Sequence, residues 1–258
     1  MTKTLMPVLF MGHGSPMNAI EDNTFTNTWK TIAKSIPKPK LILCISAHWL
    51  TNKTAILSKI NPETIHDFYG FPKELNELEY PAKGSVDFAK LVKETIKSVD
   101  VNLNETWGLD HGTWSVLVKM YPKADIPVIQ LSINPNLPLA THIQIGKELA
   151  VLRSQGVLIL GSGNIVHNLG MIRFEGEPFS WAVEFDEHVR KSLENRNIEN
   201  ILNYTKNKNG KLAVPTTDHY IPLLYIVGAS DLTEEPKFYC TEVVYSSLSM
   251  TCVVYGLK

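Results

Sequence analysis

The sequence contains little cysteine and no long hydrophobic run, and each shortage excludes a class of protein. Three cysteines among 258 residues are too few for the disulfide framework of a small secreted protein, and no CxxC pattern is present. The apolar run near the N-terminus ends at Gly12, which is too early for a signal peptide or a membrane span. We therefore expect a cytoplasmic protein with no membrane partner.

An excess of charge of one sign is also missing. The formal net charge is −1, and no run of lysine or arginine marks a basic tail. Proteins that bind nucleic acid or anionic membranes present a positive surface, so neither partner is expected. Hydrophobic residues make up 44% of the chain, which is enough to build the core of a globular protein.

Strand-like and helix-like segments alternate along the chain. Apolar or β-branched runs predict strands, the last of them a strand or hairpin, over residues 7–11, 41–46, 54–58, 127–133, 157–160 and 242–255. Helical periodicity covers residues 27–35, 86–98, 112–120, 138–153, 181–195 and 219–227. Residues 61–84 have no clean period and predict a long loop, a kind of segment that is usually functional. The alternation predicts βαβ units, a largely parallel sheet and a single domain over residues 1–258.

Most of the histidines stand where a strand ends or in a turn rich in Gly, Asn, Asp or Trp. These five of the eight are His13, His48, His111, His167 and His219. His13, His48 and His167 each follow a separate predicted strand, and strand carboxyl ends line one crevice in an open α/β sheet. The side chains could therefore converge on a metal, because imidazole binds zinc, iron and copper. The spacing equally allows histidines that are merely hydrogen-bonded, because no HExxH or HxxxH signature is present.

The remaining histidines and glycine motifs predict no separate chemistry. We expect His142 and His188 on exposed helix faces, and His66 in the long loop either as a lid residue that touches substrate or as a plain surface residue. Residues 161–164, Gly-Ser-Gly-Asn, lack the third glycine of a dinucleotide-binding loop. Residues 12–15 lack the GxSxG order of a nucleophile elbow.

Six motifs in a fixed order resemble one family, the 4,5-DOPA dioxygenase extradiol family within the class III, LigB-like extradiol ring-cleavage dioxygenases. They are Gly-His-Gly-Ser-Pro at 12–16, Ser-Ala-His-Trp at 46–49, Asp-Phe-Tyr-Gly-Phe-Pro at 67–72, Leu-Asp-His-Gly-Thr-Trp at 109–114, Gly-Ser-Gly-Asn at 161–164 with His-Asn-Leu at 167–169, and Asp-His-Tyr at 218–220. The resemblance covers the chain from about Met6 to the C-terminus. It implies a three-layer α/β/α domain with a mixed, largely parallel central sheet.

The resemblance also implies a metal site, with Fe(II) expected for activity and Zn(II) able to occupy the same place. It carries metal ligation onto His13, His48 and His219. His167 matches a position that completes the metal shell or acts as a base, and His111 matches a histidine that faces the substrate. More distant class III enzymes use two histidines and one glutamate, whereas the third position here is His219. An all-histidine shell resembles a zinc site as much as an iron site.

The implied reaction is the opening of a catechol ring beside its two hydroxyl groups, with O2 as the second substrate. His111 or His167 would take a proton from one hydroxyl and later return it. Four aromatic side chains could pack on the substrate ring or belong to ordinary packing: Phe68, Tyr69, Phe71 and Trp114. The expected partners are a small aromatic diol and O2, and the sequence predicts no oligomeric state.

Two other functions remain open. A zinc-dependent hydrolase could use a metal-bound water in the same site. A non-catalytic binding protein could retain the fold without the chemistry, but such a protein would be expected to lose histidines, and all five are present. Oxygen uptake with a catechol and added Fe(II) separates the dioxygenase from both alternatives.

Overall fold

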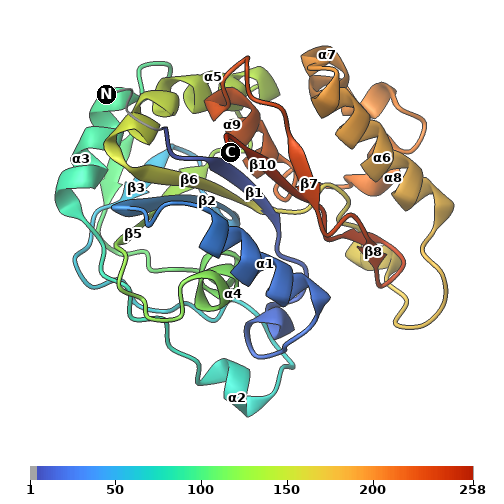
Figure 1. The fold of residues 1–258 in the computed structure, drawn as a ribbon, viewed down its shortest axis with the longest axis horizontal. Coiled ribbons are helices and arrows are strands. Elements are labelled where there is room, and N and C mark those ends of the chain that lie inside the picture. Colours follow the sequence, from blue (N-terminus) through green and yellow to red (C-terminus); the bar gives the residue numbers. More distant parts are fainter. Residues whose placement is uncertain (1–4, 258) are drawn as a thin grey trace.

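The centre of the molecule is an eight-stranded mixed sheet, described in a computed structural model over residues 5–257 (Figure 1). Its strands lie in the order β4-β3-β5-β2-β6-β1-β10-β7. Their bounds are β1 Val8–Gly12, β2 Leu41–Leu50, β3 Ala55–Leu57, β4 Asn102–Asn104, β5 Val128–Ile133, β6 Val157–Gly163, β7 Lys237–Tyr239 and β10 Cys252–Tyr255. The neighbours β5, β2, β6 and β1 are parallel, whereas β10 pairs antiparallel with β1, and β3 with β5.

Helices cover both faces of this sheet (Figure 1). One face carries α1 (Thr24–Ser35) and α4 (His111–Met120), and the other carries α3 (Val86–Thr95), α5 (Leu139–Leu149), α6 (Ser180–Glu194) and α9 (Ile221–Ala229). Shorter elements are α2 (Lys73–Asn76), α7 (Ile198–Leu202), α8 (Gly210–Ala213) and the hairpin of β8 (Val243–Val244) with β9 (Leu248–Ser249). The expected three-layer α/β/α fold with a mixed sheet is confirmed.

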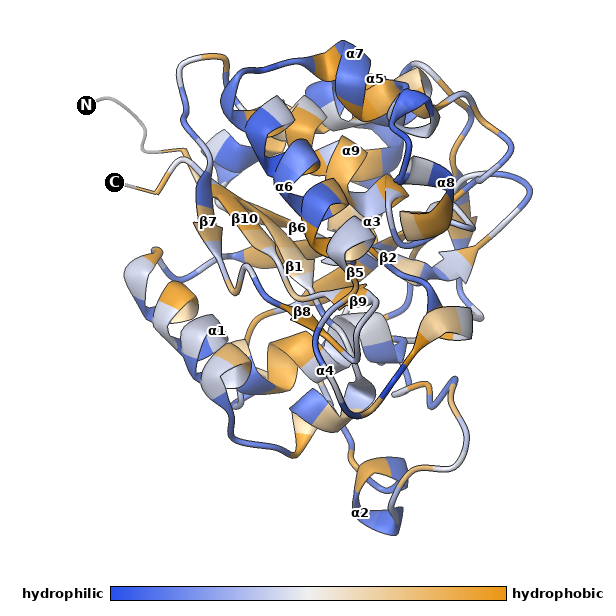
Figure 2. Cartoon of the chain, turned by 90° about the vertical axis from the view of Figure 1, so that its right-hand side faces the viewer, coloured by the Kyte–Doolittle hydropathy of each residue, from blue (hydrophilic) through white to orange (hydrophobic). Residues whose placement is uncertain are grey.

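Side chains of the central strands alternate between two hydrophobic cores. Leu9 and Cys44 pack with α1 and α4, whereas Phe10 and Leu43 pack with α5 and α9, because successive strand residues point to opposite faces. A strand that is buried on both faces has an unbroken run of apolar residues. β1 and the first five residues of β2 have such runs. Helix α9 is apolar around its whole circumference, as its orange colour in Figure 2 shows, because it packs against both the sheet and α5.

The expected elements occur within a few residues of their predicted bounds, and the strands that the sequence did not predict are short. β4 and β7 are the two edge strands, and each has three residues with little buried apolar surface. Residues 61–84 form the expected long loop, from which α2 projects at the bottom of Figure 1. Within residues 5–257, no helix combines the length and the apolar composition needed to cross a membrane.

The expectation that His142 is exposed is wrong. Its side chain on α5 is fully buried, and its Nδ1 atom lies 3.0 Å from the hydroxyl of Tyr225 on α9. The two helices approach so closely that a Cβ atom added to Gly146 would lie 2.2 Å from the carbonyl oxygen of Tyr225. This close contact buries a helix face whose polar residues suggested exposure. His188, which was also expected to be exposed, is half-buried on α6.

Candidate metal centre

The five histidines at strand ends and turns line one cavity of about 600 Å³. His13 follows β1, His48 lies near the end of β2, and His167 follows β6. Strands β2, β6 and β1 are neighbours, so their carboxyl ends bring these side chains together. His111 is the first residue of α4, and His219 shortly precedes α9. The predicted convergence of His13, His48 and His167 is therefore present, and His111 and His219 line the same cavity.

The start of α4 is fixed by Asp110, which sets the position of His111. Asp110 is the N-cap residue and accepts a hydrogen bond from the backbone amide of Thr113. The hydroxyl of Ser46 on β2 donates to the same carboxylate at 2.6 Å. This bond ties the helix to the strand that carries His48, and the rings of His111 and His48 lie with their centroids 3.8 Å apart.

Gly163 at the end of β6 allows the segment that carries His219 to approach the sheet. A Cβ atom at this position would lie 2.2 Å from the carbonyl oxygen of His219, closer than two such atoms can come. The backbone amide of Asn164 donates to the same carbonyl at 2.9 Å. The Gly-Ser-Gly-Asn motif therefore serves close packing and positions His219.

Three of the histidines form a group that could hold one metal ion. One ring nitrogen from each of His13, His48 and His219 lies within 4.8 Å of the other two, and the Nε2 atoms of His13 and His48 are 3.3 Å apart. Two nitrogens bound to one ion at about 2.1 Å and a near-tetrahedral angle are about 3.4 Å apart. The spacing therefore suits a shared divalent ion.

The second ring nitrogen of His13 is held as a hydrogen-bond donor. Its Nδ1 atom lies 2.9 Å from the hydroxyl oxygen of Ser162, and that hydroxyl donates to the carbonyl of Gly112, which leaves its oxygen free to accept. The Nε2 atom therefore presents a lone pair toward His48. Burial, together with His48 and His219, holds the pKa of His13 well below its usual value. The ring is neutral, which is the form that binds a metal.

Carboxylates hold the other two rings in the same way. Asp67 has its Oδ2 atom 3.3 Å from Nδ1 of His48, and Asp218 accepts a hydrogen bond from Nδ1 of His219. Although burial opposes it, the contacts with histidine keep the pKa of Asp67 and that of Asp218 well below their ordinary values. Such carboxylate–histidine contacts orient metal-binding rings and raise their basicity.

His111 lies beside this group of three. Its Nδ1 atom is 2.9 Å from Oδ1 of Asp67, so the same carboxylate contacts both His48 and His111. With Nδ1 committed as a donor, Nε2 of His111 is the nitrogen left with a lone pair. Burial lowers the pKa of His111, although the hydrogen bond to Asp67 opposes this shift. A neutral imidazole with one free lone pair can accept a proton.

His167 stacks on His219 instead of facing it edge-on. Their ring centroids are 3.5 Å apart and their planes differ by 6°. Lone pairs that lie in two separate parallel planes do not meet at one point, although His167, Asp218 and His219 also place ligand atoms within 4.8 Å of one another. Burial and the stacked His219 lower the pKa of His167 to about 2, so this ring too is neutral.

Two of the four aromatic candidates line the cavity. Phe68 and Phe71 contribute to its wall, whereas Tyr69 and Trp114 do not. Tyr69 is 96% exposed, and Trp114 is fully buried, with its ring centroid 6.0 Å from that of Phe68. His66 does not line the cavity either, and its Nε2 atom lies 3.0 Å from the carbonyl of Leu78, which braces the loop.

Three residues that hold the histidine rings were not assigned a role from the sequence: Ser162, Asp67 and Asp218. Asp218 could have been suspected because it directly precedes His219. Ser162 and Asp67 lie far from their partners along the chain, so only the folded structure reveals their contacts.

Comparison with known proteins gives one consistent result. Residues 7–256 match the family described as the catalytic LigB subunit of aromatic ring-opening dioxygenase. The chain is 44% identical to the 4,5-DOPA dioxygenase extradiol of Escherichia coli (strain K12), over 99% of this chain and 97% of that protein. It is 38% identical to the protein of the same name from Beta vulgaris, over 96% and 93% of the two chains.

A solved structure agrees with the sequence matches. The crystal structure of an uncharacterized protein from Escherichia coli K12 superposes with a TM-score of 0.85 at 39% identity, covering 96% of this chain and 99% of that one. The family resemblance of the six motifs and the expectation of an extradiol ring-cleavage dioxygenase are confirmed. The chain belongs to the LigB family of aromatic ring-opening dioxygenases.

Proposed function

We propose that this protein is a metal-dependent extradiol dioxygenase that opens the ring of a catechol with O2, DOPA being the catechol for which its relatives are named. One observation carries the proposal. His13, His48 and His219 each place a ring nitrogen within 4.8 Å of the other two, while the Nδ1 atoms of these rings contact Ser162, Asp67 and Asp218.

In this proposal His13, His48 and His219 hold the metal, with Fe(II) as the active form and Zn(II) as an ion that the same donors would accept. When bound, the metal supplies Lewis-acid and redox chemistry at its free positions. The chain orients these donors before the metal arrives, because each ring is fixed by a partner on its far side.

His111 acts as the base. Its free Nε2 atom accepts the proton of a catechol hydroxyl, and the Asp67 carboxylate at Nδ1 stabilises the imidazolium that forms. Proton transfer by a positioned group of this kind contributes about 10²- to 10⁴-fold to a rate. His167 lines the same cavity and is either a second base or a fourth ligand, but its pKa of about 2 makes it a weaker proton acceptor than an ordinary histidine.

The overall reaction balances without an external reductant. The bond between a hydroxylated ring carbon and its unhydroxylated neighbour breaks, and both atoms of O2 enter the product, a muconic semialdehyde. Phe68 and Phe71 form part of the wall against which the aromatic ring would pack, which also keeps water from the reacting carbons.

Anaerobic loading with Fe(II), followed by addition of a catechol and O2, tests this function. We expect one O2 consumed per catechol, with a yellow ring-fission product, and the same activity in His188→Ala, which alters a histidine outside the cavity. A Zn(II)-loaded protein that hydrolyses esters or amides while the Fe(II) form consumes no O2 would instead establish the zinc hydrolase. Catechol binding without reaction under every metal would establish the binding protein.

A further inference from the structure

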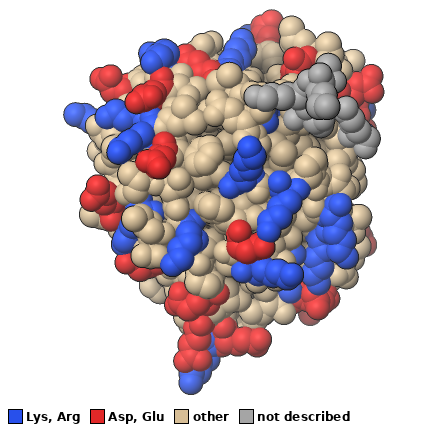
Figure 3. Space-filling model, turned by 60° about the vertical axis from the view of Figure 1, so that its left-hand side comes forward, with Lys and Arg blue, Asp and Glu red and all other residues tan. Residues whose placement is uncertain are grey.

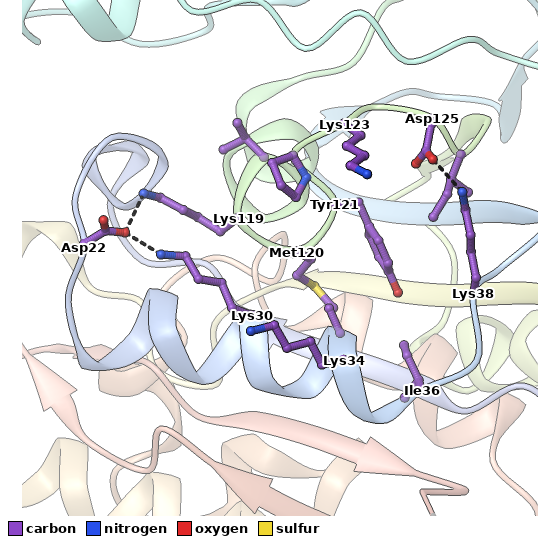
Figure 4. A pocket seen from close by; sticks show the side chains of 14 residues that line it. Asp22, Lys30, Lys34, Ile36, Lys38, Lys119, Met120, Tyr121, Lys123 and Asp125 are labelled. Carbon is purple, nitrogen blue, oxygen red and sulfur yellow. Dashed lines mark hydrogen bonds and ion pairs between the residues drawn. The ribbon is translucent and has the colours of Figure 1, made fainter.

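Positive side chains stand close together on the face shown in Figure 3, although the chain as a whole has a formal net charge of −1. A hollow of about 650 Å³ beside the ends of α1 and α4 is lined by five lysines (Figure 4): Lys30, Lys34, Lys38, Lys119 and Lys123. The carboxylates of its lining are those of Asp22 and Asp125. Five lysines against two carboxylates leave an excess of positive charge, and a hollow of one sign attracts ions of the opposite sign.

The lysine hollow is separate from the histidine cavity. Helix α4 runs from His111, which lines the cavity, to Met120, which lines the hollow, a length of about 15 Å. No described residue lines both. The ring-opening chemistry therefore makes no use of these lysines, and the hollow needs an explanation of its own.

Two of the lysines already share one anionic oxygen. The Oδ1 atom of Asp22 lies 2.6 Å from Nζ of Lys30 on α1 and 3.2 Å from Nζ of Lys119 on α4. The side chain of Lys119 is only 12% exposed, so its surroundings hold the ammonium group in place, whereas that of Asp22 is 69% exposed. A phosphate oxygen can take the position of this carboxylate oxygen, because lysine binds phosphate as a point charge without a fixed direction.

Two further lysines of the hollow are left without a carboxylate. The ion pairs here involve Lys30, Lys38 and Lys119, so Lys34 and Lys123 have no acidic partner among residues 5–257. Lys34 stands in the last turn of α1, where a cation also offsets the helix dipole, but Lys123 follows α4 outside any helix. Unpaired ammonium groups on one concave surface repel each other, and a bound anion removes this repulsion.

The rest of the lining is largely apolar and includes Ile36, Val118, Met120 and Ile126. The ring of Tyr121 also lines the hollow and extends from the end of α4 toward Ile36 (Figure 4). Its hydroxyl oxygen is buried and has no hydrogen-bond partner within residues 5–257, although buried hydroxyl groups are usually paired. An apolar ligand body would pack on these side chains, and its phosphate would offer an acceptor for this hydroxyl group once a covering side chain moves aside.

We propose that the lysine hollow binds a small molecule in which an apolar or aromatic body carries two or more negative phosphate charges, the chemistry of a nucleoside diphosphate. The phosphates bridge the lysines, and the body packs on the apolar lining beside Tyr121. Small-molecule sites are concave and mainly apolar with a few polar groups, and the volume of this hollow lies in their range. A flat membrane surface would not enter such a hollow.

Three probes test the proposal by equilibrium dialysis against the metal-loaded protein: ADP, adenosine and pyrophosphate. We expect one ADP per chain, bound about tenfold or more tightly than either of its parts, because only ADP uses both the lysines and the apolar lining. Added salt should weaken ADP binding, since it screens the charges. Pyrophosphate that binds as tightly as ADP would remove the apolar body from the proposal, and adenosine that does so would remove the charges; either result overturns it.

A charge-removal variant locates the site. Lys34→Gln combined with Lys123→Gln alters two exposed side chains, and we expect ADP affinity to fall about tenfold. The matched control is Lys90→Gln with Lys93→Gln, which removes the same charge from exposed positions on α3, outside the hollow. Unchanged affinity in the first variant, or an equal loss in both, would place ADP elsewhere, such as at the metal, and refute the proposal.

A second variant should strengthen binding, which damage to the fold cannot do. Asp22→Asn with Asp125→Asn removes the carboxylates that compete with a ligand for Lys30, Lys38 and Lys119. We expect ADP affinity to rise about threefold or more, because more positive charge faces the ligand. No rise would contradict the proposal. An oligonucleotide or an anionic vesicle that displaces ADP and binds more tightly would show that the partner is a macromolecule or a membrane instead of a small ligand.

Discussion

The Nδ1 atom of His111 lies 2.9 Å from one oxygen of Asp67, while the other oxygen of that carboxylate lies 3.3 Å from Nδ1 of His48. One side chain thus orients both the proposed base and a proposed metal ligand. Asp67 comes from the long loop of residues 61–84, so the order of that loop and the geometry of the site depend on each other. The loop is therefore part of the candidate site and not a cover over it.

The first prediction concerns Asp67→Asn, which keeps the shape of the side chain but removes its charge. We expect metal affinity to fall about tenfold, because His48 loses its carboxylate partner, and turnover at saturating Fe(II) to fall about 10²-fold, because the imidazolium of His111 is no longer stabilised. Metal titration and oxygen uptake measure the two effects. Asp125→Asn, an exposed carboxylate paired with Lys38, should change neither, and an unchanged Asp67→Asn would show that the carboxylate is dispensable.

The second prediction concerns Gly163→Ala. The new methyl group would meet the carbonyl of His219 at 2.2 Å, so the segment before α9 must shift. We expect the free energy of unfolding to fall by about 2 kcal/mol, as for other overpacked sites, and metal affinity to fall because His219 is displaced. Urea unfolding and metal titration test this. Gly170→Ala is the control, because its added Cβ would have only an ordinary contact at 3.4 Å, and equal losses in both variants would refute the packing argument.

The third prediction concerns stability below neutral pH and His142. Burial lowers the pKa of His142 from 6.5 to about 4, so between these values the unfolded chain binds a proton that the folded protein does not. The free energy of unfolding therefore falls as the pH falls through this window, by about 2 kcal/mol from this residue between pH 7.5 and pH 5. In His142→Gln the difference in unfolding free energy between these two pH values should shrink by that amount. A difference that remains at the parent's size would assign the pH dependence to other groups.

Sequence patterns predicted the parts of this molecule that local chemistry determines. The unbroken apolar runs of β1 and β2 identified buried strands, and the positions of His13 and His48 at their ends predicted convergence. The contacts of Asp67 could not be predicted, because the loop has no periodicity and its partner His111 lies 44 positions away. The burial of His142 was missed for a related reason, since it depends on how closely α5 and α9 pack.

The fourth prediction concerns the division of roles among the histidines, because a ligand and a base fail differently when removed. His13→Ala or His48→Ala should lower metal occupancy, since each removes one nitrogen of a three-nitrogen group. His111→Ala should keep the metal, because the ring contacts Asp67 and lies outside the three-histidine group. Its turnover should still fall about 10²-fold or more, the scale of a lost acid–base group. Elemental analysis beside oxygen uptake at saturating Fe(II) measures both quantities.

His167→Ala decides the remaining assignment. Its ring is stacked parallel to His219 and stands outside the group formed by His13, His48 and His219. We therefore expect this variant to keep its metal and to lose activity, because the ring lines the cavity beside the proposed ligands. Loss of metal together with activity would make His167 the fourth ligand. A metal-free His111→Ala protein would show that ligand and base have been exchanged, and full activity in that variant would remove His111 from the reaction.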